Sequence, residues 1–410
     1  MYQIKIPQNI KLENLEAYYQ ELNDKINKNI VVDLLLPKKI LYGYLGIVPS
    51  LYQFVFTWVR YENSGKLLLD IEKPGETDFE EIYKNELLFP LVSLVWNKNG
   101  IYNNQGKINL RNFLKPQNSI IFDKMQSLEP LKNKNLLLTN FDHLPNERGI
   151  LKFFETNQEF IKNESKLSES LDFSISKLLL DYSRDSSKMF LKEKKSLVSI
   201  IFELMKNTYE WARDNENRIP LDPNVRGVHV KLVKKRRNSL IDDFRYHPGL
   251  CEYFSSEVLK ENSQNELLFL EISVFDSGIG FVRKNIFQYP ELSEIEIIKK
   301  CMIKHSTSSL DLGKDDKGLG LDRILTILDR SKGLFRLKTG SVCVYRNMIT
   351  HKYKIIETGN LKKMELFDWV NNSNTKYSSF IPAEGTVITI LYPLSLIESN
   401  EINNEQLSYL

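Results

Sequence analysis

The sequence predicts a mixed α/β protein, and three observations carry this prediction. Short apolar segments of strand type alternate with longer segments in which apolar residues recur at helical spacing. Hydrophobic residues make up 42% of the chain and charged residues 27%, the proportions of an ordinary globular protein. At 410 residues, the chain has room for two or three domains with well-buried cores. We therefore expect an α+β architecture divided into domains.

The N-terminal part has the order strand, helix, strand. Residues 29–36 (NIVVDLLL) and 66–74 (KLLLDIEKP) are apolar runs of strand type, and residues 51–61 mix aromatic and apolar residues at near-helical spacing. This order predicts a small α/β domain over residues 1–150. The domain resembles the STAS domains that accompany some bacterial regulatory ATPases; the alternative is an unrelated α/β adaptor, and its role is left open.

Changes in composition suggest the other boundaries. Residues 97–150 are rich in Asn, Lys, Gly and Pro and either close the first domain or carry a linker. Residues 151–190 become helical and are expected to form a linker or a dimer helix, which leaves a homodimer open. A second domain is expected over residues 191–398, followed by a tail of residues 399–410.

A single helix is expected over Ser196–Asn215, because apolar residues recur at helical spacing and the run contains neither Gly nor Pro. At about 100° per residue, one narrow stripe carries five polar residues: Ser199, Glu203, Asn207, Glu210 and Asp214. A carboxylate and a carboxamide are thus one turn apart. On the helix alone a solvated face is the simpler interpretation, but the apolar residues close to the stripe argue against it.

Two strands are expected next, over residues 226–233 and 266–275. The insertion between them, residues 234–265, begins with a run of four basic residues (KKRR), and its function is left open. Such a run is more often a solvated loop than a nucleic-acid contact. The net charge of +3 also gives no argument for nucleic acid or an anionic membrane surface.

Three more motifs follow in order. The second strand ends in residues 276–280 (DSGIG), where a carboxylate can accept a hydrogen bond from an exocyclic amine and glycines let the backbone approach a ligand. Residues 317–321 (KGLGL) open a helix, whose first N–H groups suit phosphates, and residues 305–316 before it suit a mobile lid. Residues 385–390 (GTVITI) begin a strand with a threonine hydroxyl. Each motif alone is also compatible with an ordinary turn, helix start or strand.

Taken together and in this order, the acid-and-amide helix and the three motifs resemble the N, G1 and G2 boxes and the closing strand of the GHKL ATPases. This superfamily comprises gyrase, ninety-kilodalton heat-shock chaperones, histidine kinases and MutL-type repair proteins. The resemblance covers about residues 190–395. It implies a Bergerat fold, an α/β sandwich in which ATP lies between a mixed sheet and helices under a flexible lid.

The resemblance also implies roles for particular residues. Glu203 would be the general base that orients the attacking water, and Asn207 would hold Mg²⁺ on the triphosphate. Asp276 would pair with the adenine amino group, assisted by Thr386. The remaining expected contacts come from glycine turns that admit the nucleotide and bind its phosphates: Gly278, Gly280, Lys317, Gly318, Leu319 and Gly320.

Departures from the family patterns bear on the reaction. None of the five histidines lies in a helix before Ser196, as the phosphorylated histidine of a sensor kinase would. Glu210 stands where kinases often place Lys, and residues 301–310 resemble the MutL-type lid. The sequence GLGL at residues 318–321, however, is closer to the form of the G2 box found in kinases. We expect a slow Mg²⁺-dependent ATPase whose lid closure regulates binding of an unidentified protein partner; the alternatives are a serine/threonine or histidine protein kinase-like regulator, or a nucleotide switch without hydrolysis.

The cellular setting is predicted from absent signals. The N-terminus lacks the pattern of a signal peptide, and no apolar run approaches the ~20 residues that span a bilayer. Cys251, Cys301 and Cys343 are scattered and odd in number, which argues against a disulfide framework. We therefore expect a cytoplasmic, bacterial protein without membrane or nucleic-acid partners.

Overall fold

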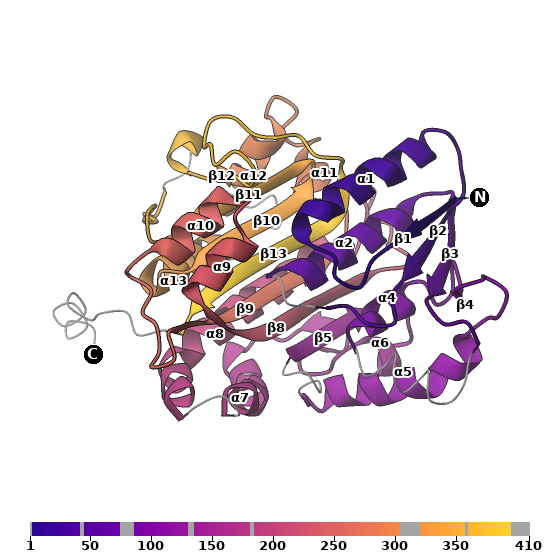
Figure 1. Cartoon of the computed structure of the whole chain (residues 1–410), viewed down its shortest axis with the longest axis horizontal. Coiled ribbons are helices and arrows are strands. Elements are labelled where there is room, and N and C mark those ends of the chain that lie inside the picture. The colour runs from indigo at the N-terminus through magenta and orange to yellow at the C-terminus, as the bar shows by residue number, and fades with distance from the viewer. Residues whose placement is uncertain are drawn as a thin grey trace.

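The computed structural model describes residues 2–41, 45–73, 86–129, 135–180, 184–303, 320–356 and 360–394. It confirms the mixed α/β class, since helices accompany a four-stranded sheet, a seven-stranded sheet and a two-stranded ribbon. Figure 1 shows the N-terminal sheet to one side of the larger sheet, which crosses the middle of the molecule.

The N-terminal sheet is parallel and has the order β1-β2-β3-β4. Its strands are β1 (Tyr2–Lys5), β2 (Val32–Leu36), β3 (Ser64–Leu69) and β4 (Ile101–Asn103). Parallel neighbours need crossover connections, and these carry α1 (Leu12–Ile26), α2 (Ile47–Arg60), η1 (Glu86–Leu88) and α4 (Phe89–Leu94). The predicted strand, helix, strand order corresponds to β2, α2 and β3.

The seven-stranded sheet has the order β12-β11-β10-β13-β9-β8-β5. Its strands are β5 (Asn135–Phe141), β8 (Val225–Arg236), β9 (Glu266–Asp276), β10 (Leu334–Gly340), β11 (Val342–Asn347), β12 (Phe367–Asp368) and β13 (Ala383–Pro393). Every pair of neighbours is antiparallel. The resemblance implied a mixed sheet, and this detail was wrong: neighbouring strands of the seven-stranded sheet run in opposite directions throughout.

The sheets do not divide the chain at residue 150. Strand β5 precedes that position, yet it pairs with β8 from Asn135 opposite Lys231 to Phe141 opposite Val225. The segment 97–150 thus holds β4, α5 (Arg111–Gln126), β5 and α6 (Asn146–Gly149), and its last strand belongs to the larger sheet.

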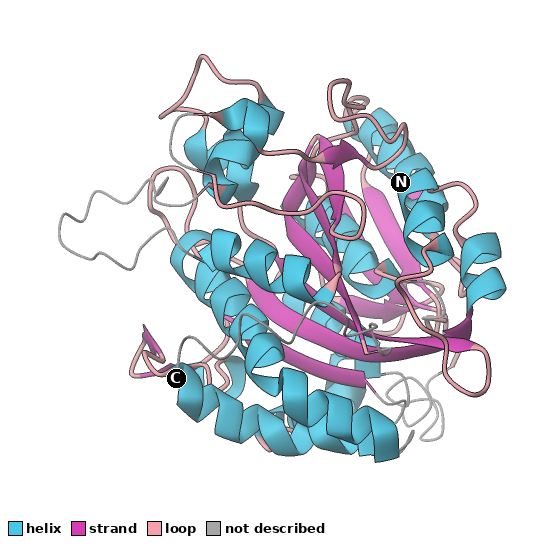
Figure 2. Ribbon diagram, turned by 90° about the vertical axis from the view of Figure 1, so that its left-hand side faces the viewer, coloured by secondary structure: helices cyan, strands magenta, loops and turns pink. Residues whose placement is uncertain are grey.

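Helices cover both faces of the large sheet (Figure 2). One face carries α8 (Arg184–Trp211) and α13 (Gly320–Ser331), with α7 (Glu164–Leu180) packed on α8, and α11 (Gly280–Asn285) and α12 (Glu294–Met302) beside them. The short elements are β6 (Glu155–Thr156), β7 (Glu159–Phe160) and η2 (Leu361–Lys363).

Helix α8 ends at Trp211, four residues before the expected end, and Asp214 instead forms a bridge with Pro220. Asp214 therefore does not share the polar stripe.

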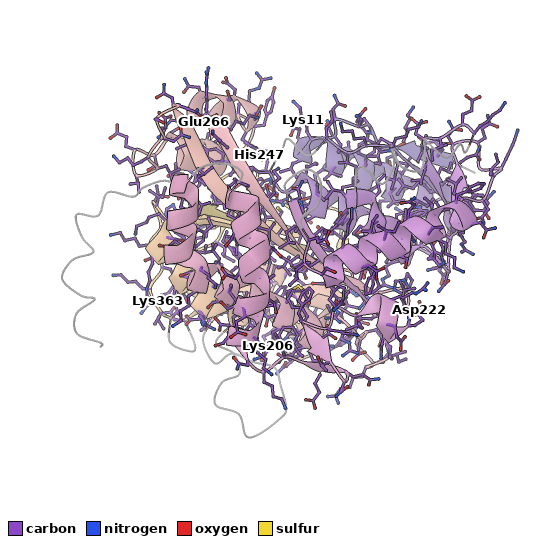
Figure 3. All side chains as sticks on the ribbon, turned by 90° about the horizontal axis from the view of Figure 1, so that it is seen from below. Lys11, Lys206, Asp222, His247, Glu266 and Lys363 are labelled. Atoms are coloured by element: carbon purple, nitrogen blue, oxygen red, sulfur yellow. The ribbon has the colours of Figure 1, made fainter. Side chains whose placement is uncertain are left out.

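Helix α2 covers the opposite face, which we call the back face. Residues 47–59 of α2 are all buried, because the helix lies between the N-terminal sheet and β9 and β13. Tyr52 contacts Phe275 of β9 edge-to-face, with ring centroids 5.0 Å apart. Helix α1 meets the same face at its edge, where Figure 3 shows Lys11 near His247, and Glu13 lies 4.0 Å from His247. Burial, with Arg336 adding to it, lowers the pKa of His247 to about 4, so this contact is not an ion pair at neutral pH.

The basic run 234–237 is not a solvated loop, so this expectation was wrong. Lys234 and Lys235 extend β8, and the chain continues into α9 (Arg237–Asp243) and α10 (Pro248–Ser255). Lys234 pairs with Glu266 at 3.1 Å, and Lys235 pairs with Asp243. Arg237 pairs with Glu261 and donates to three backbone carbonyls of the insertion. These basic groups therefore hold the insertion together.

A search of the described residues for membrane-spanning helices found none with the length and apolar character that crossing a bilayer requires.

Candidate functional site

A single open pocket brings four separated motifs together. It lies between α8, α11, α12, α13 and the ends of β9 and β13, and it encloses about 1030 Å³ of empty space, part of it open to solvent. Glu210 of the polar stripe lines it, and so do five of the residues expected to contact the nucleotide: Asn207, Asp276, Gly280, Gly320 and Thr386. The mixed apolar and polar lining suits a small-molecule ligand.

The wall from α8 is partly apolar. Leu204, Thr208 and Trp211 line the pocket together with Asn207, while Val274 and Ile388 line it from the sheet. Alternate residues of a strand face the same side, so Val274 and Asp276 both face this pocket. The helix spacing predicted from the sequence therefore places the carboxamide of Asn207 in this wall, together with the polar side chains of Thr208 and Glu210.

Asp276 is the acidic group on the floor of the pocket. It is 6% exposed and stands opposite Thr386 in the β9–β13 register. Its carboxylate accepts a hydrogen bond of 2.9 Å from the Gly278 N–H. Burial raises the pKa of Asp276 to about 7, although backbone hydrogen bonds from Gly278 and Thr386 oppose the shift. A ligand that donates a hydrogen bond here would favour the charged carboxylate.

The glycines of the 276–280 turn serve two purposes. A Cβ atom at Gly278 would lie 2.7 Å from Cα of Ala212, so the space that Gly278 leaves lets the turn approach the end of α8. Gly280 lines the pocket itself and has φ +75°, a conformation that side chains disfavour. Only Gly280 of this pair leaves room directly at the pocket.

Gly320 begins α13 beside the acid and the amide of α8. A Cβ atom at Gly320 would lie 3.0 Å from Oε2 of Glu203 and 3.6 Å from Nδ2 of Asn207. The N-terminus of a twelve-residue helix, with its unpaired N–H groups, thus lies against both side chains. Lys317, Gly318 and Leu319, with the expected lid at 305–316, lie outside the described residues.

Arg323 is a residue that the sequence analysis missed. Its Nη1 lies 2.9 Å from Oε1 of Glu203 and 2.8 Å from Oε2 of Glu164, and its Nη2 lies 2.9 Å from the Ser199 hydroxyl. Burial lowers the pKa of Arg323, but hydrogen bonds to Glu164 and Glu203 raise it overall. Its place three residues after Gly320, one turn along the helix, is the signal that would have found it.

This cluster leaves one negative charge to spare. Two carboxylates, Glu164 and Glu203, share the single positive charge of Arg323. Because Glu164 takes part of that charge, Arg323 orients Oε1 of Glu203 without neutralising the pair of acids. Oε2 of Glu203 lies on the side of Gly320 and Asn207.

Most of the far rim of the pocket was also missed. It is formed by Phe281, Lys284 and Asn285 of α11 and by Cys301 of α12. Burial raises the pKa of the Cys301 thiol to about 12, so this side chain is a neutral, largely apolar part of the wall. Lys284 adds a positive charge to the pocket that Glu210 of the polar stripe also lines.

Residues that could bind a metal are few at this site. Within the described ranges, no group of three or more His, Cys, Asp or Glu residues could hold a metal ion. Mg²⁺ in nucleotide sites is commonly bound by one or two protein oxygens together with phosphate oxygens and water. The amide oxygen of Asn207, beside the start of α13, fits that limited role.

Thr386 stands among hydroxyl groups. Its Oγ1 lies 3.3 Å from Oγ1 of Thr339, which in turn lies 3.2 Å from the Gly385 carbonyl oxygen. A hydroxyl both donates and accepts, so this pair offers adaptable polar contact beside Asp276.

Comparisons with models of known protein families, with curated proteins and with solved structures found no match to this chain.

Proposed function

We propose that this protein binds ATP with Mg²⁺ in the pocket between α8 and the sheet and hydrolyses it slowly. One observation carries the proposal: Asn207, Asp276, Gly320 and Thr386, from four motifs spread over 180 positions, line one pocket. Independent turns and strands would not be expected to converge in this way.

The base would lie at the floor of the pocket. Asp276 would accept a hydrogen bond from an exocyclic amino group, and the Thr386 hydroxyl would assist, either directly or through water. The apolar wall of Leu204, Val274 and Ile388 would cover the rings. The buried carboxylate supports this assignment, because without a donor its charge is costly.

The phosphates would lie at the start of α13. The helix N-terminus favours negative charge there, and Gly320 leaves space beside Asn207. The amide oxygen of Asn207 would hold Mg²⁺, which neutralises phosphate charge when bound. Glu203 would accept the proton of the attacking water through Oε2, while Arg323 holds Oε1.

The proposal is tested by two measurements on the full chain. Calorimetric titration with ATP and Mg²⁺ should show binding, and a phosphate-release assay should show slow turnover. With γ-labelled ATP, the label should appear as inorganic phosphate. Absence of ATP binding overturns the proposal, and label on protein instead of in solution replaces hydrolysis with phosphoryl transfer. Regulation of a protein partner stays a prediction of the sequence.

A further inference from the structure

The side of the pocket floor that faces away from the ligand is held by the N-terminal part of the chain. Asp276 and Thr386 face the pocket, but their neighbours in sequence, Ser277 and Gly385, carry backbone groups that face α2. Helix α2 is separated from them by 217 and 332 residues respectively. These contacts are therefore purely tertiary.

Three polar side chains of α2 make the contacts. Arg60 Nη2 donates to the Ser277 carbonyl at 2.7 Å, and the Glu384 N–H donates to Oγ1 of Thr57 at 2.9 Å. Gln53 Nε2 donates to the carbonyls of Lys338 at 3.1 Å and Gly385 at 3.4 Å. Positions 53, 57 and 60 are spaced i, i+4 and i+7, so they form one polar stripe, which Ser50 extends, on a mainly apolar helix.

All of these contacts except the one from Gln53 to Lys338 lie beside a residue of the proposed base site. Ser277 follows Asp276 directly, and residues 384 and 385 precede Thr386 directly. Ser277 and Gly385 are buried, and a buried backbone carbonyl left without a hydrogen bond destabilises the folded state. The stripe therefore fixes the backbone from which both base-contacting side chains project.

We propose that Gln53, Thr57 and Arg60 of α2 are positioning residues that set the selectivity of the pocket for a 6-amino purine. The inference rests on the proposed function, since it concerns the base end of the same nucleotide. The inference also assigns a role to the N-terminal α/β part: its helix α2 supports the base site from the back face of the sheet. A shift of the turn by a fraction of an ångström would misalign Asp276 with an amino group but would leave the phosphate end unchanged.

The experiment compares the affinities of the full chain for ATP and ITP, which differ at position 6 of the purine. Wild-type protein should prefer ATP, and Arg60→Met should lower the ATP:ITP preference about tenfold, chiefly by weakening ATP, since one lost aligned hydrogen bond to a charged group is of this order. The matched control is Arg148→Met, which removes an exposed arginine of α6 and should leave the preference at the wild-type value.

A second pair guards against misfolding of the arginine variant. Thr57→Val replaces the hydroxyl with a methyl group, whereas Thr57→Ser keeps the hydroxyl. The valine variant should lose preference and the serine variant should regain it, a rescue that a merely structural role would not produce. Unchanged ATP:ITP preference in folded Arg60→Met and Thr57→Val overturns the inference alone. Wild-type protein that binds neither nucleotide overturns the proposed function together with it.

Discussion

The two faces of the seven-stranded sheet differ in what covers them, although the same strands build both. On the pocket face, Val274 and Asp276 of β9 line an open cavity. On the back face, Phe275 packs on Tyr52 of α2, and Glu271 accepts a 2.9 Å hydrogen bond from the Gly46 N–H. The pocket face is thus left accessible, whereas the back face is closed by another part of the chain.

The difference shows how strand alternation separates binding from support. Residues that alternate along β9 and β13 serve opposite faces, so a ligand-facing side chain and its supporting neighbour are adjacent in sequence. The back face also contains buried charges, such as Lys338 and Arg336, that pair with or contact α1 and α2. Changes on the pocket face should therefore affect ligands, and changes on the back face should mainly affect stability or selectivity.

The largest effect is expected at the pocket face with Glu203→Gln. Loss of the proposed base should lower the rate of phosphate release at least about 100-fold, while ATP affinity changes little. The exposed Glu169→Gln on α7 is the matched control and should retain wild-type turnover. Phosphate release by Glu203→Gln at the wild-type rate would remove Glu203 from this role.

Asp276→Asn should change binding and stability in opposite directions. ATP affinity should fall about tenfold or more, because a charged acceptor is lost. The folded-state pKa of Asp276, about 7, lies above the unfolded value, so this group contributes stability that is lost as pH rises through 7. At pH 8 the nucleotide-free variant should therefore have a higher free energy of unfolding, by about 1 kcal/mol or more.

Denaturant titrations of both proteins at pH 8 and pH 5 measure this stability difference. The gain should shrink at pH 5, where wild-type Asp276 is protonated. If wild type and Asp276→Asn are equally stable at pH 8 and at pH 5, the charged carboxylate carries no burial cost. If their ATP affinities are also equal, the carboxylate does not contact the base.

The pH dependence of ATP binding should report the same group. As pH falls below 7, protonation of Asp276 removes the acceptor, so the affinity of wild-type protein for ATP should fall by up to about tenfold per pH unit. Calorimetric titrations between pH 6 and pH 8 measure this slope, with Asp276→Asn as the reference that lacks the ionisation. A slope shared by wild type and Asp276→Asn assigns the pH dependence to another group.

The smallest effect is expected at the back face with Lys338→Met. The side chain of Lys338 is 4% exposed and pairs with Glu16, whose side chain is 36% exposed. Removing the buried partner leaves Glu16 in water, so the free energy of unfolding should change by less than about 1 kcal/mol. Glu16→Ala leaves the lysine buried and should cost more. A reversed order of the two variants in thermal or denaturant unfolding contradicts this account.

Much of the fold could be predicted because its signals are local. The apolar run before Asp276, the helical spacing around Glu203 and the strand after Gly385 each appear within a few residues. The structure confirms a mixed α/β class, and it places these elements as β9, α8 and β13. Errors arose where the partners are distant: the basic run at 234–237 looked like a solvated loop because its acidic partners lie up to 32 residues away.

The sequence by itself determined which residue types the elements carry and the order in which the motifs occur. Only the tertiary structure decided that Arg323 pairs with Glu164, 159 residues away, and that Arg60 reaches Ser277 behind the pocket. The physical reason is that hydrophobic period and turn chemistry belong to short segments, whereas ion pairs and buried hydrogen bonds belong to surfaces that meet only after folding.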